Sequence, residues 1–186
     1  RFEGTPYFNG GLFAEIRPIE MTDDELADMR RACKTDWSAV RPEIFGTLFE
    51  TSMDKGERHA LGAHFTSQAD IMKVISPCIV RPWMARIDAA KTINDYELIL
   101  LDMANYRVLD PACGSGNFLY VAYREMRRLE AEAKRRLVER TRGGERGQEG
   151  LSYVTTDHFL GMDLNPFAIE VAKVTLMMGK KLASDE

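Results

Sequence analysis

Hydrophobic residues in the first hundred positions recur every three or four residues, the spacing that places them on one face of a helix. Thr22 begins a capping box, and the helix that follows is expected to run to about Thr35. A second helix is expected to begin near Pro42, and a third is capped by Thr66 or Ser67. The residues expected on the buried faces of these helices are Leu26, Met29 and Cys33, then Ile44, Phe45, Leu48 and Phe49, then Ile71, Val74 and Ile75.

The helical pattern continues to about residue 104. Pro77 is expected to kink or divide the third helix, because proline has no N–H to donate within it. The apolar spacing resumes at Ile79, Trp83 and Ile87. A further helix is expected over residues 96–104.

From residue 106 the pattern predicts a strand, a helix and a second strand. The first strand covers residues 106–109 and leads into a glycine-rich turn at 110–116. The second strand covers residues 158–162 and is followed by Asp163 and by a helix that opens with Asn165-Pro166. Because crossovers of this kind are right-handed, the two strands should be parallel neighbours. The helix between them carries its apolar face at Phe118, Ala122, Met126, Leu129, Ala133 and Leu137.

The amino-acid composition excludes several classes of protein. A chain of 186 residues with 45% hydrophobic and 29% charged residues is ordinary for one folded domain, which excludes wholesale disorder. The apolar runs are far shorter than the roughly 20 residues of a membrane span, so no membrane association is expected. The net charge of -4 does not indicate a free-standing nucleic-acid binder. The three cysteines and three histidines lack zinc or disulfide spacing, so no metal site is expected and a reducing cytosol fits best.

The glycine-rich turn indicates a site for a nucleoside-containing cofactor. Gly114 and Gly116 would let a ligand approach bare backbone at a helix N-terminus. Asp110 and Asp163 would both lie beyond the carboxyl ends of the strands, where parallel sheets bind ligands. A carboxylate after the second strand is able to accept hydrogen bonds from both hydroxyls of a ribose.

The spacing of the glycines in this turn distinguishes among the possible cofactors. The position of the third glycine in the dinucleotide pattern is Leu119, which argues against NAD, and the phosphate-loop sequence is absent. S-adenosylmethionine (AdoMet) remains, and Asp110 suits its ammonium and sulfonium groups. Cys113 is interpreted as a small loop residue and not as a nucleophile, since no histidine partner is placed beside it.

Three segments resemble, in the family's own order, motifs of the N6-adenine DNA methyltransferases. They are Gly62-Ala-His-Phe-Thr-Ser67, Asp110-Pro-Ala-Cys-Gly-Ser-Gly116 and Phe159-Leu-Gly-Met-Asp-Leu-Asn-Pro-Phe167. The segments 6–13 and 44–50 are closer still to one branch, the large single-polypeptide type II restriction–modification enzymes and related phage-defence methyltransferases. The resemblance covers nearly the whole chain.

The resemblance implies an α/β fold of the AdoMet-dependent methyltransferase (Rossmann-like) type, truncated after about two parallel strands. Residues 1–104 would be a mainly helical segment that includes the motif at 62–67, and residues 105–186 would be the first part of the AdoMet-binding core. The implied function is the AdoMet-binding portion of an adenine-N6 DNA methyltransferase of a restriction–modification system. Its full-length parent would act on double-stranded DNA in a prokaryotic cytoplasm.

The resemblance also assigns roles to individual residues. Thr66 would bond the methionine carboxylate of AdoMet, unless it serves only as a helix cap. Asp163 would hold the ribose, unless it only caps the helix that follows. The remaining implied contacts are His64 and Phe65 at the methionine end, Asp110 with the backbone of Ala112, Cys113 and Gly114 along the methionine moiety, and Leu164 beside the adenine.

The family's catalytic sequence, Asn-Pro-Pro-aromatic, does not occur in these 186 residues. Asn165-Pro166-Phe167 lacks one proline and belongs to the second-strand motif. The chain opens with Arg1 and is interpreted as a piece of a longer protein whose catalytic residues lie beyond Glu186. By itself it should bind cofactor at most. Two alternatives stay open, a methyltransferase of protein or RNA amines and a non-catalytic helical scaffold that links nuclease and methylase parts.

Two further expectations concern the surface of the molecule, namely its charged stretch and the edges of its sheet. Residues 124–146 contain nine basic residues and five glutamates, which would suit a DNA-facing stripe. A solvated helix with pairs such as Glu130 with Lys134 and Glu132 with Arg136 is favoured instead. A sheet of two strands has open edges, so the chain is expected to self-associate.

Overall fold

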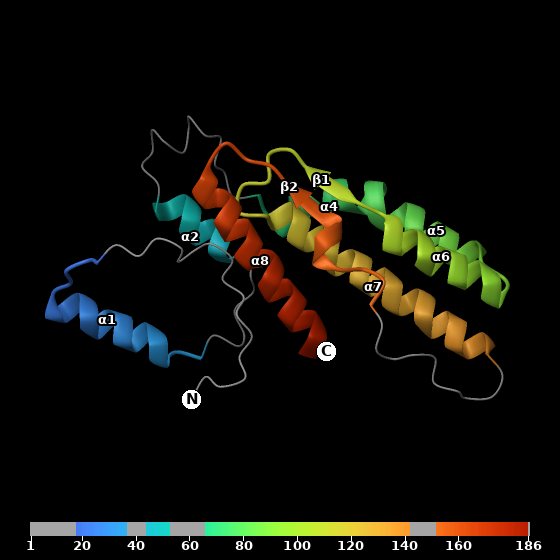
Figure 1. Ribbon diagram of the computed structural model, residues 1–186, viewed down its shortest axis with the longest axis horizontal. Helices are drawn as coiled ribbons and strands as arrows, with labels where there is room; N and C mark the ends of the chain where they lie inside the picture. The colour runs from blue at the N-terminus through green and yellow to red at the C-terminus, as the bar shows by residue number, and fades with distance from the viewer. Residues whose placement is uncertain (1–17, 37–43, 53–65, 142–151, 186) are drawn as a thin grey trace.

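The computed structural model describes residues 18–36, 44–52, 66–141 and 152–185, and these form a mainly helical molecule with a small sheet (Figure 1). The helices are α1 Asp23–Lys34, α2 Ile44–Ser52, α4 Gln68–Ile75, α5 Arg81–Ala89, α6 Ile93–Asn105, α7 Asn117–Arg140 and α8 Pro166–Asp185. A π-helical turn, η1 Ser76–Val80, joins α4 to α5, and a 3-10 turn, η2 Thr156–His158, precedes the second strand. The strands are β1 Val108–Asp110 and β2 Phe159–Gly161. Within the described residues, no helix is long and apolar enough to cross a membrane.

The two strands form the parallel pair that the sequence predicts. Their register aligns Val108 with Phe159, Leu109 with Leu160 and Asp110 with Gly161. β1, α7 and β2 therefore make the expected βαβ unit. A two-stranded parallel sheet among many helices is consistent with the first part of a Rossmann-like fold.

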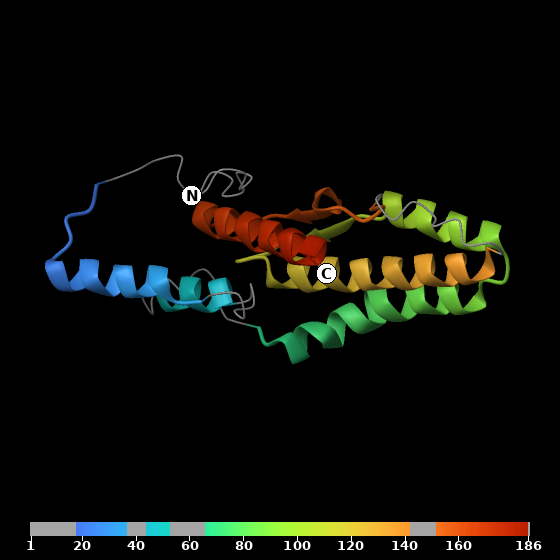
Figure 2. The ribbon, with the colours of Figure 1, turned by 90° about the horizontal axis from the view of Figure 1, so that it is seen from below.

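Helix α7 is the centre of the molecule. The sheet, α6 and α8 lie on one side of it, and α4, η1 and α5 lie on the other (Figures 1 and 2). Because α7 is covered from several directions, buried residues occur around most of its circumference, among them Leu119, Val121, Met126 and Leu129, each at most 2% exposed. The apolar spacing predicted for this helix is confirmed, and it continues into one core with α4, α5 and α6.

The helix predicted to kink at Pro77 does so through a π-turn. Pro77 cannot donate the hydrogen bond of a regular helix, and the chain widens over Ser76–Val80 before α5 continues. Trp83 and Ile87 on α5 are buried, as predicted. The cap of α4 is Ser67, whose hydroxyl accepts from the backbone N–H of Asp70 at 3.2 Å. Thr66 is therefore not the cap.

The predicted buried face of the first helix is wrong, and so is the predicted burial of Ile44 and Leu48 on the second. The capping box of α1 is present, with Thr22 Oγ1 accepting from Glu25 N at 3.4 Å. Yet no residue of α1 is buried, and Met29 is 55% exposed. On α2, Ile44 and Leu48 are 37% and 52% exposed. Spacing predicts that a helix has an apolar face but not what covers it. The start at Pro42 and the side chains of Phe45 and Phe49 lie outside the described residues.

Candidate cofactor site

The loop between β1 and α7 lies against the end of β2. The backbone N–H of Met162 donates to the carbonyl of Asp110 at 2.9 Å, and the N–H of Cys113 donates to the carbonyl of Met162 at 2.9 Å. These bonds extend the pairing of the strands beyond the sheet itself. The glycine-rich loop is thereby placed at the carboxyl edge, where parallel sheets bind ligands.

Asp163 connects this loop to the start of α8. Its Oδ2 accepts from the N–H of Gly114 at 2.9 Å, and its Oδ1 accepts from the N–H of Asn165 at 2.8 Å. A carboxylate has about four acceptor positions, so both oxygens keep capacity for a further donor such as a ribose hydroxyl. The cap of α8 is Asn165, as predicted, since its Oδ1 accepts from the N–H of Phe167 at 2.9 Å.

Glycine is favoured at positions 114 and 116 of the loop for partly different structural reasons. Gly114 and Gly116 have φ values of +51° and +83°, which favour glycine at both positions. A Cβ at Gly116 would lie 2.9 Å from the Cβ of Ala172, so Gly116 allows the loop to pack on α8. A Cβ at Gly114 would meet no atom of the described residues within 4 Å. As far as these residues go, Gly114 therefore leaves room for a ligand to approach the backbone.

Four N–H groups of the loop donate to acceptors within the protein. The N–H of Ala112 donates to Asp110 Oδ1 at 3.1 Å, that of Cys113 to Met162, that of Gly114 to Asp163, and that of Gly116 to the carbonyl of Cys113 at 2.8 Å. A phosphate-binding loop instead points such groups at the anion. This arrangement therefore favours a ligand recognised by carboxylates over one that carries phosphates.

Cys113 is a packing residue of the loop. It is 6% exposed, and its Sγ would lie 2.8 Å from a Cβ placed at Gly161, which shows how closely the loop sits on β2. Burial, and then the negative charges of Asp110 and Asp163, raise the pKa of the Cys113 thiol to about 11. The thiol is therefore protonated at neutral pH, which agrees with its interpretation as a non-nucleophilic residue.

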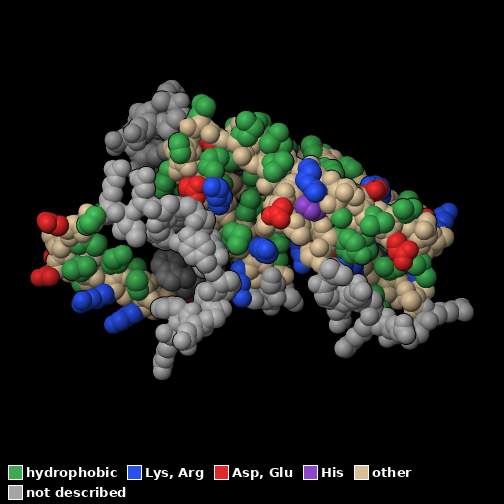
Figure 3. Space-filling model, viewed as in Figure 1, with side chains coloured by type: hydrophobic (Ala, Val, Ile, Leu, Met, Phe, Trp, Pro, Cys, Tyr) green, Lys and Arg blue, Asp and Glu red, His purple; other side chains and the backbone are tan. Residues whose placement is uncertain are grey.

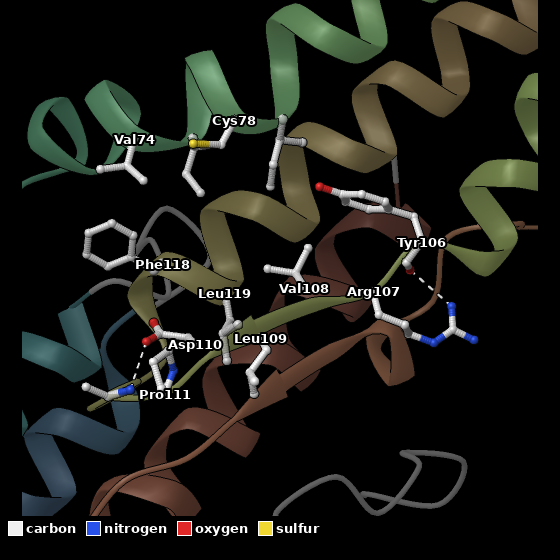
Figure 4. Close-up of a pocket in the computed structure, with 13 residues that line it drawn as sticks. Val74, Cys78, Tyr106, Arg107, Val108, Leu109, Asp110, Pro111, Phe118 and Leu119 are labelled. Atoms are coloured by element: carbon white, nitrogen blue, oxygen red, sulfur yellow. Dashed lines mark hydrogen bonds between the residues drawn. The ribbon is translucent and has the colours of Figure 1, made fainter.

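A cavity of about 440 Å³ opens beside Asp110, between α4–η1 and β1 (Figure 4). The Asp110 carboxylate lies at the same end of this cavity as Phe118 and Val74, and Tyr106 lies at the other end. Most of the lining side chains are apolar. A single carboxylate at the border of an apolar hollow suits a ligand that combines an aliphatic chain with a positive charge.

Sequence reasoning missed part of this cavity wall. Cys78 and Val74 line it, although Val74 was expected in the core and is 49% exposed. Cys78 lies in the π-turn that follows from Pro77, and π-turns inside helices are frequent at functional sites. In the sequence, Pro77 was the signal from which an irregular turn at this part of the cavity wall could have been inferred.

The other predicted site residues differ in how they are placed. Leu164 directly follows Asp163 and is 93% exposed, so its side chain is uncovered. Thr66 is half-buried and immediately precedes the cap of α4. The hydrogen bonds that join the loop to β2 and Asp163 do not include Thr66. His64 and Phe65 lie outside the described residues.

Many of the charges on α7 are paired with one another, and Arg136 also pairs with Asp88 on α5 at 2.8 Å. The two predicted pairs are confirmed, with Lys134 Nζ 2.6 Å from Glu130 Oε1 and Arg136 Nε 2.6 Å from Glu132 Oε1. Glu132 also pairs with Arg135, and these two hydrogen-bonded arginines lower the pKa of Glu132 to about 2. The predicted pairs are therefore present, but the prediction of a solvated helix is wrong where neighbouring elements cover α7, since Glu130 is 1% exposed.

The βαβ unit, with carboxylates at both strand ends and a glycine turn between them, is consistent with the first part of a Rossmann-like fold. Residues 87–185, more than half of the chain, match the family model described as MmeI, DNA-methyltransferase domain. The chain belongs to this family.

Two relatives show the extent of the similarity. DNA methyltransferase A of Bacillus subtilis (strain 168) is 33% identical over 188 residues, which cover 97% of this chain and 20% of that protein. The type IIL restriction–modification enzyme MmeI, solved in complex with DNA, matches with a TM-score of 0.80 and 34% identity over 97% of this chain and 25% of that one. The chain thus spans about a fifth to a quarter of the length of these relatives.

Proposed function

We propose that this chain is the AdoMet-binding portion of an adenine-N6 DNA methyltransferase of a restriction–modification system. The observation that carries the proposal is a pair of strand-end carboxylates, Asp110 and Asp163, on either side of a loop in which the N–H groups of Ala112, Cys113, Gly114 and Gly116 already have acceptors in the protein. Membership of a methyltransferase family implies a methyl donor. When bound, AdoMet supplies the activated methyl group.

The residues present fit the chemical groups of AdoMet. AdoMet carries an ammonium group, a sulfonium group and a ribose diol, and it has no phosphate. Asp110, at the border of the apolar cavity, provides the negative charge for the cationic end. Asp163 provides acceptor positions for the ribose, and the exposed Leu164 an apolar surface for the adenine. We assign Thr66, His64 and Phe65 to the methionine end on the family resemblance.

The choice of adenine N6 as acceptor rests on the motif resemblance. The solved relative is described as a complex with DNA, and we propose double-stranded DNA as the substrate of the full-length parent, in a prokaryotic cytoplasm. The test is transfer of labelled methyl groups by the parent protein to DNA, RNA and protein acceptors, with mass spectrometry of the product. N6-methyladenine in DNA is the expected product, and a methylated protein or RNA amine would contradict the proposal.

Cofactor binding is tested on this chain by calorimetric titration with AdoMet, with NAD as the control ligand. The variant Asp110→Asn keeps an oxygen to accept from the N–H of Ala112 but removes the charge. Because hydrogen bonds to charged groups contribute about 1.5–3 kcal/mol, it should weaken AdoMet binding roughly ten- to a hundredfold. Saturable binding of NAD, or unchanged affinity of the variant, would contradict the assignment.

A further inference from the structure

Helix α2 lies in close contact with the glycine-rich loop at Gly46. Gly46 is buried, and a Cβ placed there would lie 2.6 Å from Asn117 Nδ2 and 2.7 Å from Ser115 Oγ. Ser115 belongs to the loop and Asn117 is the first residue of α7. Both ribbon views place α2 beside this end of α7 (Figures 1 and 2). A helix from the N-terminal segment therefore contacts the side chains of the glycine-rich loop at a distance that only glycine allows.

The loop is held from a second side by α8. Gly116 packs on Ala172, with no room for a Cβ, and α2 itself packs against α8. The loop therefore lies in a corner formed by α2 and α8. Its ligand side is at Gly114, where no atom of the described residues lies within 4 Å of a Cβ position, away from both close contacts.

Asn117 shows that this corner is maintained by packing. The side chain is 7% exposed, and its Oδ1 is buried without a hydrogen-bond partner in the part of the chain that the structure describes. An unpaired buried acceptor costs about 1–3 kcal/mol, so the local hydrogen bonds of Asn117 do not by themselves favour this position. Gly46 lies close against this side chain, in a contact that leaves no room for a Cβ.

We propose that Gly46 is a positioning residue of the cofactor site. Through it, α2 holds Ser115 and Asn117, and with them the loop, in the conformation that accepts AdoMet, without α2 itself touching the ligand. The N-terminal segment is on this view part of the binding machinery and not only a connection to it. The inference rests on the proposed AdoMet function of the same loop.

The test compares two glycine-to-alanine variants. Gly46→Ala places a methyl group against Asn117 and Ser115. Gly179→Ala is the matched control, because it is also a glycine within a helix, and its Cβ would lie 2.8 Å from the ring of Tyr120 instead of the loop. Both changes raise helix propensity by a similar amount. Any difference between them therefore reports on where the methyl group is placed.

Two measurements are made on each variant. Hydrogen exchange of the Gly114 and Gly116 amides, without cofactor, reports on the loop, since the first donates to Asp163 and the second to the carbonyl of Cys113. Calorimetry gives the affinity for AdoMet. Gly46→Ala should accelerate exchange of both amides and weaken binding by about tenfold or more, whereas Gly179→Ala should change neither by more than about twofold. Adding Ser115→Ala and Asn117→Ala to Gly46→Ala removes both close contacts and should restore the protection of the amides.

Unchanged loop exchange in Gly46→Ala would overturn the inference. So would equal effects of the two glycine variants, because these would indicate general destabilisation. If the wild-type chain fails to bind AdoMet, the proposed function fails, and the exchange comparison still decides whether α2 positions the loop. The two failures are therefore distinguishable.

Discussion

At the scale of single residues, a substitution of Leu164 most clearly distinguishes an effect on AdoMet binding from an effect on stability. It is 93% exposed, so Leu164→Ser should change the free energy of unfolding by less than about 0.5 kcal/mol. If its side chain covers the adenine of AdoMet, loss of that apolar contact should weaken binding by about 1–2 kcal/mol, or roughly tenfold. Calorimetry and thermal denaturation measure the two effects.

The matched control for this substitution is Leu101→Ser on α6, where the leucine is 53% exposed. It should leave the affinity for AdoMet unchanged. Equal affinities of the two variants would remove Leu164 from the site. Unfolding of Leu164→Ser alone would assign it a structural role instead.

Cys113 should resist alkylation while the protein is folded. Cys33 and Cys78 are exposed, whereas Cys113 is buried with its pKa raised to about 11. With iodoacetamide at pH 8, we expect mass spectrometry to find the two exposed cysteines modified and Cys113 modified only after denaturation. Alkylation of Cys113 at the rate of Cys78 would contradict the closed packing of the loop.

The same raised pKa predicts the sign of a pH effect. Between the unfolded thiol pKa of about 8.5 and the folded value, the native state holds a proton that the unfolded state has lost. The stabilisation from the neutral thiol is therefore complete below that range and is lost as the pH rises toward about 11. Urea unfolding of the wild type and of Cys113→Ala between pH 8 and pH 11 measures this contribution.

At the scale of elements, Glu130 connects α7 to the segment that leads into β2. Its side chain is 1% exposed and accepts from the backbone N–H groups of Tyr153 at 2.9 Å and Val154 at 3.2 Å. It also forms ion pairs with Arg127 at 2.8 Å and Lys134 at 2.6 Å. Glu130 therefore satisfies several groups that would otherwise lack an acceptor.

Removing this carboxylate should be costly. Glu130→Ala should lower the free energy of unfolding by about 3 kcal/mol, because it leaves charges and backbone donors unpaired. Glu132→Ala, on the more exposed side of the same helix, should cost less than about 1 kcal/mol. Urea unfolding measures both, and similar losses in the two variants would contradict the role given to Glu130.

Local sequence signals predict the elements well. The capping box at Thr22, the proline at 77 and the Asn165-Pro166 pair each correspond to a feature in the expected place. These signals work because each depends on residues only a few positions apart. Burial on α1 and α2 was predicted wrongly, because burial depends on which parts of the chain come to cover a helix.

In the candidate site too, the sequence predicts the features that depend on nearby residues but not those that depend on tertiary packing. The sequence places Asp110 and Asp163 at the ends of adjacent strands, and the structure confirms this placement. The bond from Gly114 to Asp163 joins residues 49 positions apart, and no local pattern predicts it. The approach of Gly46 to Asn117 likewise depends on the tertiary packing of α2. The roles of Thr66, His64 and Phe65 stay predictions.

At the scale of the whole molecule, one face of the sheet is uncovered. Leu109 and Leu160 are aligned neighbours on that face and are 57% and 50% exposed. Figure 3 shows hydrophobic side chains gathered along the upper edge of the molecule, near the ends of the strands. Exposed apolar surface next to strand edges favours association between chains.

We therefore predict that this chain self-associates in solution. Sedimentation velocity over a range of concentrations should show species larger than a monomer for the wild type. Leu160→Glu places a charge on the uncovered face and should return the protein to a monomer. A wild type that stays monomeric at the highest concentration would refute the prediction.

We propose above all that the β1–α7 loop, together with Asp163, forms an AdoMet site. The most direct test of this proposal is a titration of the isotopically labelled chain with AdoMet, followed residue by residue through its backbone amide NMR signals. If the proposal is right, the largest changes should occur at residues 110–116 and 163–165 and should saturate together. Saturating changes confined to another part of the molecule, or no change at millimolar AdoMet, would contradict it.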